Sequence, residues 1–488
     1  MAPHQLSTSV APNLFMSTIA LTILEHFLTV AGVVLALFAF ARLFSERRQP
    51  GNTVAWLMGI ILIPYVAVPL FLLVGGRKIR RLMKRKSKVV PAVAGVVGCQ
   101  SDASATPTAQ TVSSISECPV IGCNDLRLLT TGEEAYAALE QAIRGAKHSI
   151  HITTFILGRD DTGRRIVRML AEKAKEGVKV RLLLDAVGCL FSSRGFVDPI
   201  RQAGGEVAVF MPVLPFSTLR NSANLRNHRK LAVFDQHTAF IGGHNLAREY
   251  LGPTPLKKRW RDFGAMVSGP SATLLNDVFL ADWSFAADQP MKELRAEALP
   301  DAVRQEGEAE VQVVASGPDC AGDALYEGII SMVQEAKQSI VIVTPYFIPD
   351  EVLYRSLIVK ARAGCDVTIV VPEKSNHPVT DYARRHFLRE LQGAGADVRL
   401  FGPGMMHSKG VIVDDRLGLL GSANLDLRSL FVNFEVGLFV YSRPDVLAMR
   451  AWAAGLIAHS KPSPVRRKAL GFGHTVLEEC CRLLAPLL

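Results

Sequence analysis

A chain of 488 residues is longer than one ordinary domain core and suggests two or three domains. Its net charge of +10 is concentrated at the N-terminus, because residues 1–88 hold eleven of the 55 Lys and Arg residues but only two of the 45 acids. The remainder is nearly balanced, which argues against a nucleic-acid partner, since neutralising many phosphates needs a basic surplus. The eight cysteines form no CxxC pair or His/Cys cluster, so they indicate neither a structural zinc site nor a disulfide framework.

Two hydrophobic segments open the chain. Residues 53–76 carry no charge and are long enough to cross the hydrocarbon core, so we expect a transmembrane helix there. Residues 17–41 are apolar apart from Glu25 and His26, so this segment either spans the membrane as well or enters only part-way; we favour a span. A cleaved signal peptide is disfavoured because residues 1–16 contain no Lys or Arg.

A basic run, "RKIRRLMKRKSK", follows the second hydrophobic segment and holds eight basic residues in twelve. By the positive-inside rule this run stays in the cytoplasm, and the rest of the chain with it. It is either a simple stop-transfer flank or a segment that also attracts anionic lipid headgroups. We therefore assign residues 1–88 to a membrane anchor made of a transmembrane helical hairpin and its basic flank.

A linker and a duplicated α/β unit follow the anchor. The stretch "QSDASATPTAQTVSSISE" is small and polar, so we expect a flexible linker over residues 89–123. "AYAALEQAIRGAKHSIHITTFIL" matches "ALYEGIISMVQEAKQSIVIVTPYFI", each an amphipathic helix that leads into a hydrophobic strand. Helices that alternate with such strands predict two similar α/β sandwich lobes, over residues 124–300 and 301–488.

One polar skeleton occurs twice, 179 residues apart. Each copy reads His, Lys two residues later, Asp five after that, and Gly-x-x-Asn at the end of a second hydrophobic run. The first copy comprises His228, Lys230, Asp235 and Asn245, and the second comprises His407, Lys409, Asp414 and Asn424. Strand alternation directs the His and Lys to one face, and a hairpin returns the Asn beside the Lys. This combination indicates a phosphate site in which the asparagines bind substrate.

Two such sets suit a double displacement at a phosphodiester. One neutral imidazole would attack phosphorus, while the other, protonated, would donate to the departing oxygen and later accept a proton from the acceptor. The lysines and asparagines would stabilise charge on the nonbridging oxygens, as Mg²⁺ does in other phosphoryl-transfer sites, so we expect neither a metal nor another cofactor. Two copies at identical spacing argue against the alternative of an ordinary surface strand.

Four carboxylates accompany the two motifs. Asp235 and Asp414 are part of the catalytic motifs, but they fall on the opposite strand face from the histidines, so we expect them to anchor each hairpin without touching substrate. Asp262, in "WRDFGAM", and Glu435, in "NFEVGLF", are better placed to orient the imidazoles.

These residues resemble the phospholipase D superfamily, whose members carry one HxKxxxxD motif in each of two lobes. Within it, "GSANLDLRSLFVNFEVGL", "VTPYFIPDEVL" and "RRQPGNTVAWLMGIILIP" are similar to bacterial cardiolipin synthases. The resemblance covers nearly the whole chain except the linker, and it implies two phospholipase D-like lobes with the active site between them. It also implies a multi-pass protein of the bacterial inner membrane with cytoplasmic lobes.

The resemblance further implies condensation of two phosphatidylglycerols into cardiolipin and glycerol through a phosphatidyl-histidine. Spacing alone does not say which imidazole attacks, and the resemblance favours His228 as nucleophile and His407 as acid and base. The partners would be membrane phospholipids; the oligomeric state stays open. Alternatives are a hydrolytic phospholipase D, a transferase with another acceptor headgroup and, from a different class, an inactive phosphatidate-binding protein. The presence of both histidines counts against the last.

Overall fold

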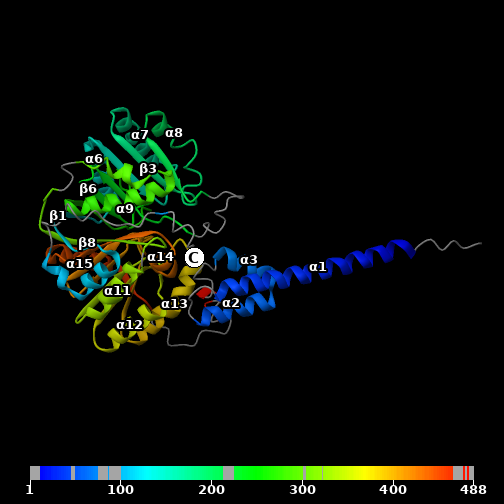
Figure 1. Cartoon of the computed structure of the whole chain (residues 1–488). Helices are drawn as coiled ribbons and strands as arrows, with labels where there is room; N and C mark the ends of the chain where they lie inside the picture. The colour runs from blue at the N-terminus through cyan, green and yellow to red at the C-terminus, as the bar shows by residue number, and fades with distance from the viewer. Residues whose placement is uncertain are drawn as a thin grey trace, which may run out of the picture. The chain divides into compact units, whose positions relative to one another are not determined.

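The computed structural model describes residues 11–44, 50–74, 86, 101–212, 225–299, 304–320 and 322–464, and residues 476, 478, 481 and 482. The chain divides into two units (Figure 1). The smaller contains residues 1–77 and 216–224, and the larger contains residues 78–215 and 225–488.

The smaller unit contains helices α1 (Ala11–Phe44), α2 (Pro50–Leu62) and α3 (Pro64–Val74). The expected single helix over residues 53–76 is therefore wrong: it is divided at Ile63, because Pro64 cannot donate a backbone hydrogen bond and its ring clashes with the preceding turn. Trp56 and Phe71 would lie about 22 Å apart along one continuous helix, yet their ring centroids are 5.3 Å apart, so α3 folds back on α2. Among the described residues, the structure contains no helix both long and apolar enough to cross a membrane.

The described residues of the larger unit form one mixed sheet of 15 strands. Its first half contains, in sheet order, β1 (Ile121–Leu129), β7 (Gly264–Ser268), β6 (Thr238–Gly242), β5 (Leu231–Phe234), β2 (Ser149–Thr154), β3 (Lys179–Asp185) and β4 (Glu206–Phe210). Its second half repeats that order with β8 (Ala309–Ser316), β16 (Glu435–Val440), β14 (Leu417–Gly421), β13 (Gly410–Val413), β9 (Ser339–Val343), β11 (Asp366–Pro372) and β12 (Asp397–Phe401). Strand β17 (Ser460–Pro462) extends the second edge, and β10 (Phe347–Ile348) pairs with β15 (Leu425–Asp426) separately.

The two halves are joined edge to edge, because β1 pairs antiparallel with β8 across an irregular register between Ile121 and Asn124. The Asn124 side chain links the two strands at this junction by donating to the carbonyls of Ile121 and Gly122, both at 2.9 Å, and of Ala309 at 3.3 Å. The α/β fold expected from the sequence is thus confirmed, with its two halves sharing one sheet. The expected boundary near residue 300 lies outside the described residues.

Helices cover both faces of each half (Figure 1). The first half has α6 (Gly132–Gly145), α7 (Asp161–Lys175), α8 (Asp198–Gln202), α9 (Pro270–Ala287) and α10 (Met291–Arg295). The second has α11 (Ala324–Glu335), α12 (Glu351–Arg362), α13 (Pro378–Gly393), α14 (Leu427–Phe431) and α15 (Arg443–Ala458). Equivalent helices begin with equivalent signals, since Asp160 caps α7 and Asp350 caps α12 through backbone N–H groups.

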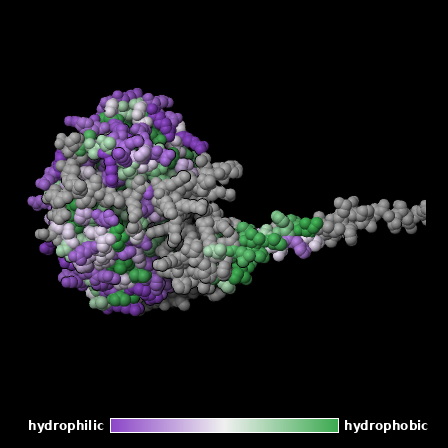
Figure 2. Space-filling view, in the orientation of Figure 1, coloured by the Kyte–Doolittle hydropathy of each residue, from purple (hydrophilic) through white to green (hydrophobic). Residues whose placement is uncertain are grey.

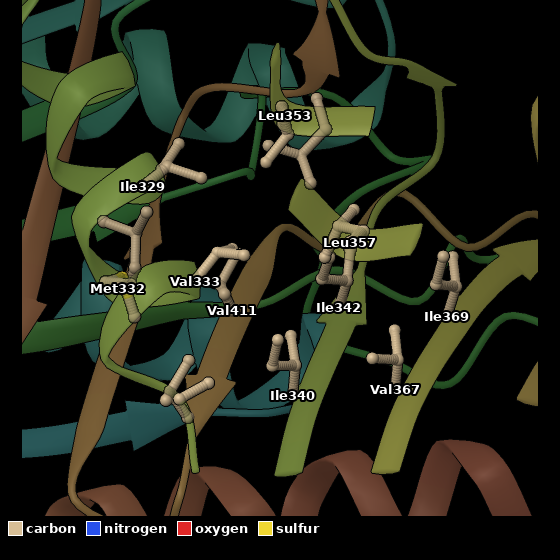
Figure 3. Packing of buried hydrophobic residues seen from close by; sticks show 14 of the residues in the cluster. Ile329, Met332, Val333, Ile340, Ile342, Leu353, Leu357, Val367, Ile369 and Val411 are labelled. Atoms are coloured by element: carbon tan, nitrogen blue, oxygen red, sulfur yellow. The ribbon is translucent and has the colours of Figure 1, made fainter. Parts of the chain in front are cut away.

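Strand alternation decides which helices each strand side chain meets. In the second half, Ile340 and Ile342 of β9 pack with Ile329 and Met332 of α11 and with Leu357 of α12 (Figure 3). In the first half, the alternate residue His151 of β2 points to the other face, where its ring stacks on Phe279 of α9 at 4.8 Å. Each half therefore has its own buried apolar layer beneath a pair of helices.

The expected flexible linker over residues 89–123 is wrong in its described part. Residues Asp102–Ala105 form a 3₁₀ helix and α5 (Pro107–Ser116) follows it. Ala109 and Val112 of α5 are fully buried in the core of the second half, and Gln312 donates to the Ala109 carbonyl at 3.2 Å. The close packing of α5 on α11 depends on Gly328 of α11, since a Cβ there would lie 2.8 Å from Val112. Residues 89–100 lie outside the described part of the chain.

Candidate active site

The two motifs form matching hairpins at equivalent places in the sheet. Strand β5 pairs with β6 after His228, and β13 pairs with β14 after His407. The Asp235 carboxylate accepts hydrogen bonds from the backbone N–H groups of residues 147–149 at 2.7–2.9 Å. The Asp414 carboxylate does the same with residues 337–339 at 2.7–2.8 Å. Both carboxylates therefore tie their hairpin to the start of a neighbouring strand, away from the histidines.

Each histidine is held by a carboxylate from the opposite half of the unit. The His228 Nδ1 lies 2.8 Å from Glu435 Oε1, and the His407 Nδ1 lies 2.7 Å from Asp262 Oδ2. Backbone bonds repeat this exchange, because His228 donates to the Phe434 carbonyl at 2.9 Å and His407 donates to the Arg261 carbonyl at 2.6 Å. A carboxylate at Nδ1 fixes the ring and leaves Nε2 for chemistry. The two halves thus complete one another's histidine.

The two lysines are buried beside their histidines. Lys230 donates from Nζ to the His228 carbonyl at 2.8 Å and lies 5.6 Å from the Phe155 ring centroid. The Lys409 Nζ lies 2.8 Å from Nδ1 and 3.0 Å from Nε2 of His407. Burial lowers the pKa of Lys230 to about 7 and that of Lys409 to about 8, against the opposing attraction of the nearby carboxylates. Both ammonium groups are therefore poorly solvated, so a nearby anion would stabilise their charged form.

Burial also keeps both imidazoles neutral in the free site. It lowers the pKa of His228 to about 4, although Glu435 opposes the shift. Burial and the Lys409 cation lower the pKa of His407 well below its usual value. The two carboxylates differ. Burial raises the pKa of Asp262. For Glu435, burial is outweighed by the attraction of His228 and Lys230 and by the hydrogen bonds with His228 and Ser422, so its pKa is lowered. A phosphodiester anion in this site would raise the pKa of an adjacent imidazole and so supply the protonated partner.

A cavity of about 370 Å³ connects the two motifs. His228 and His407 both line it, as do the predicted asparagines Asn245 and Asn424. The Asn245 side chain also accepts from the backbone N–H of Ile156 at 3.1 Å, and the Asn424 amide donates to Ser429 Oγ at 3.3 Å. The structure therefore brings both histidines and both asparagines to one space, while Lys230 and Lys409 lie immediately behind the histidines.

Sequence reasoning missed several cavity residues. Arg226, Tyr250, Tyr346 and Arg428 line the same space. The Tyr250 ring lies 5.1 Å from that of His407 in an edge contact. Three of them carried a sequence signal, since Arg226 comes two residues before His228, Arg428 four residues after Asn424 and Tyr250 five residues after Asn245. Tyr346 is distant from both motifs in sequence and is brought in by the fold.

A fully buried charge cluster lies behind the first motif. The Arg229 guanidinium donates to Asp282 at 2.5 Å and to the backbone carbonyl of Glu435 at 2.9 Å. Lys86 pairs with Asp282 at 2.8 Å and also with Asp319. Its ammonium lies 5.0 Å from the ring centroid of Phe434. Lys86 belongs to the run expected to be a basic membrane flank. The structure instead buries its side chain in the larger unit, where two carboxylates compensate its charge.

The described residues include no group of three or more His, Cys, Asp or Glu side chains that could hold a metal ion. Arg226 and Arg428 line the cavity, whereas Lys230 and Lys409 lie behind the histidines.

The comparisons with known proteins agree with this geometry. Residues 139–283 and 329–457 match the family described as cardiolipin synthase, PLD-like domain, and residues 34–76 match the phospholipase D-nuclease N-terminal family. Cardiolipin synthase from Halalkalibacterium halodurans is 34% identical over 462 residues, 91% of each chain. That from Alkalihalophilus pseudofirmus is 33% identical over 474 residues, 94% of each chain.

The fold also occurs in a solved structure. Phosphatidylserine synthase from Haemophilus influenzae superposes with a TM-score of 0.60 and 18% identity, covering 78% of this chain and 100% of that chain. At this identity the likeness concerns the fold alone. The sequence relatives carry the assignment and confirm the resemblance seen in the motifs: the chain belongs to the cardiolipin synthase family and is an enzyme of the phosphatidyltransferase type.

Proposed function

We propose that this enzyme transfers a phosphatidyl group from one phosphatidylglycerol to another, giving cardiolipin and glycerol. The observation that carries the proposal is the crossed arrangement of two histidine–carboxylate pairs around one cavity, His228 with Glu435 and His407 with Asp262. Two imidazoles at one phosphate allow one to form a covalent bond while the other moves protons.

In the first step, Nε2 of His228 attacks phosphorus while its Nδ1–H donates to Glu435. The bond from phosphorus to the glycerol headgroup oxygen breaks, and that oxygen takes a proton from Nε2 of His407. This step forms a phosphatidyl-histidine and releases glycerol. Asp262 stabilises the charged form of His407 through Nδ1.

In the second step, a hydroxyl of a second phosphatidylglycerol gives its proton to His407 and attacks phosphorus. The phosphorus–nitrogen bond breaks and restores neutral His228. Lys230 and Lys409 stabilise negative charge on the nonbridging oxygens in both steps, with amide donation from Asn245 and Asn424.

A hydrolytic phospholipase D would share the first step and differ only in the acceptor. The deciding experiment is incubation of the purified enzyme with phosphatidylglycerol vesicles, with products identified by mass. We expect cardiolipin and free glycerol in equal amounts. Phosphatidic acid without cardiolipin would reassign the enzyme as a hydrolase. A phospholipid with another headgroup, formed in place of cardiolipin, would reassign the acceptor.

The proposed site of action is the bacterial inner membrane, with the catalytic unit on the cytoplasmic side. The helices of the smaller unit expose large apolar side chains, including Ile23, Phe27, Leu37, Ile61 and Leu62, each more than half exposed. Figure 2 shows this surface as predominantly hydrophobic, which suits an apolar surrounding. The basic run at residues 77–88 supports the orientation. A cysteine introduced at residue 359, which is exposed on α12, should resist an impermeant thiol reagent in intact cells; ready labelling would reverse the orientation.

A further inference from the structure

The loop that follows β3 exposes three large apolar side chains beside the active-site cavity. Val187 is 49% exposed, Leu190 54% and Phe191 76%. The same loop places Cys189 and Val197 in the buried core, so it is packed from within while its tip faces outward. An apolar tip on a packed loop is a feature of surfaces that meet a partner. We call Val187, Leu190 and Phe191 the apolar rim.

The apolar rim is fixed to the cavity wall. Phe155 and Ile156 line the cavity, and the Cys189 thiol contacts the Phe155 carbonyl at 3.2 Å. Ser192 donates to the Leu157 carbonyl at 2.5 Å. The loop is therefore hydrogen-bonded to the segment that forms the wall of the cavity beside His228, whose ring lies 5.0 Å from that of Phe155.

Asp185 secures the base of the same loop to the first motif. Its carboxylate accepts from the backbone N–H groups of Val187 at 2.9 Å, Gly188 at 3.1 Å and Asn227 at 3.0 Å. Asn227 immediately precedes His228 in the chain. The position of the apolar rim relative to His228 is thus set by direct hydrogen bonds.

The matching loop of the second half is polar. It follows β11, as the first loop follows β3, and it reads Glu-Lys-Ser-Asn-His over residues 373–377. Asn376 and His377 of this polar loop line the cavity, and Tyr346 Oη lies 2.5 Å from Asn376 Oδ1. The loop after β3 is therefore apolar at its exposed tip, whereas the loop after β11 supplies hydrogen-bonding groups to the cavity wall.

Two exposed arginines accompany the apolar rim. The Arg159 guanidinium lies 6.0 Å from the ring centroid of Phe196 in the same loop, and Arg194 is exposed three residues after Phe191. Apolar tips next to cationic side chains suit a membrane interface, where the former enter the acyl region and the latter meet anionic phosphates.

We propose that the apolar rim of Val187, Leu190 and Phe191 inserts into an anionic phospholipid bilayer at the mouth of the cavity, while the polar loop at 373–377 faces water. This inference rests on the proposed function, because a lipid-transferring site must open toward its substrate. It identifies the partner as a lipid surface. It also means that the first half of the site faces the bilayer and the second half faces water, although the two motifs are alike.

The test pairs Leu190→Ser/Phe191→Ser with the control Val359→Ser, which changes a 62% exposed apolar side chain on α12. Each full-length variant is assayed on long-chain phosphatidylglycerol vesicles and on monomeric short-chain phosphatidylglycerol. We expect the ratio of vesicle to monomer activity to fall about tenfold for the double variant, since two apolar side chains lose their insertion, and to stay within about twofold for the control. An unchanged ratio in the double variant, or an equal fall in the control, would overturn the proposal.

A binding measurement separates this inference from the proposed reaction. Vesicles of phosphatidylglycerol with brominated acyl chains should quench the tryptophan fluorescence of the Phe191→Trp variant more strongly than that of the wild type, which has four native tryptophans. Val359→Trp should add no quenching. Equal quenching of the Phe191→Trp variant and the wild type would overturn insertion. If the wild type makes no cardiolipin, the proposed reaction fails while the quenching result still decides whether the apolar rim enters the bilayer.

Discussion

The two halves of the catalytic unit share their geometry and differ in their chemistry. Both hold a histidine with a carboxylate from the other half, but Glu435 serves the first motif and Asp262 the second. The residue between His and Lys is a buried Arg229 in the first motif and Ser408 in the second. The duplication therefore gives both motifs the same geometry, and single differences around them give the two histidines different surroundings.

The strongest test of that inequivalence replaces each histidine. His228→Ala and His407→Ala should each lower turnover by at least about a thousandfold, because the pair acts as a unit. A phosphatidyl ester with a good leaving group needs no general acid, so His407→Ala should still accumulate a covalent adduct, while His228→Ala should form none. Rapid quench and peptide mapping measure the adduct. An adduct on His407 would exchange the two roles.

The crossed carboxylates should have smaller effects of different kinds. Glu435→Gln and Asp262→Asn keep size and remove charge, and each should lower turnover by about a hundredfold through loss of the stabilised imidazolium or ring orientation. Glu435→Gln should slow adduct formation even with a good leaving group, whereas Asp262→Asn should slow mainly the step that needs proton transfer. Identical single-turnover profiles for the two variants would mean that the two pairs are functionally equivalent.

Among the described residues, the cluster of Lys86, Arg229, Asp282 and Asp319 lies behind the first motif and has no counterpart behind the second. Lys86→Met should destabilise the protein by about 3 kcal/mol, because Asp282 and Asp319 would be left with too little buried positive charge. Thermal unfolding of the detergent-solubilised enzyme measures this change. Lys258→Met, which removes an exposed lysine of the same unit, is the control and should be nearly neutral. A similar loss in both variants would attribute the effect to the loss of a positive charge in general.

The lysines should give the smallest and most gradual difference. With the pKa of Lys230 lowered to about 7 and that of Lys409 to about 8, Lys230 loses its charge first as pH rises. The KM for phosphatidylglycerol should therefore rise by about tenfold between pH 6 and 9, since two phosphate-stabilising cations become neutral. Lys230→Arg should move the onset from about pH 7 toward about 8, because arginine stays charged. Onset near pH 8 in Lys409→Arg but near 7 in Lys230→Arg would reverse the assignment.

The sequence predicted the local elements well because their signals are local. The alternation around the two motifs, the repeated helix–strand pairs and the fall of Asp235 and Asp414 on the far strand face depend only on neighbouring residues. Two predictions failed where local composition was ambiguous. Small polar side chains at residues 107–116 resembled a linker but pack as α5 against α11, and an uncharged run at 53–76 concealed the break at Pro64.

What the sequence by itself determined is which groups are present: two hairpins with the same His, Lys, Asp and Asn pattern, two further carboxylates and a basic N-terminal run. Only the tertiary structure decided the pairing, namely that each histidine takes the carboxylate of the other half, that Lys86 of the basic run joins a buried cluster, and that both motifs line one cavity. The physical reason is range. Backbone alternation and helix periodicity act over a few residues, whereas these pairings join groups 145 to 233 residues apart through the burial of two halves on one sheet.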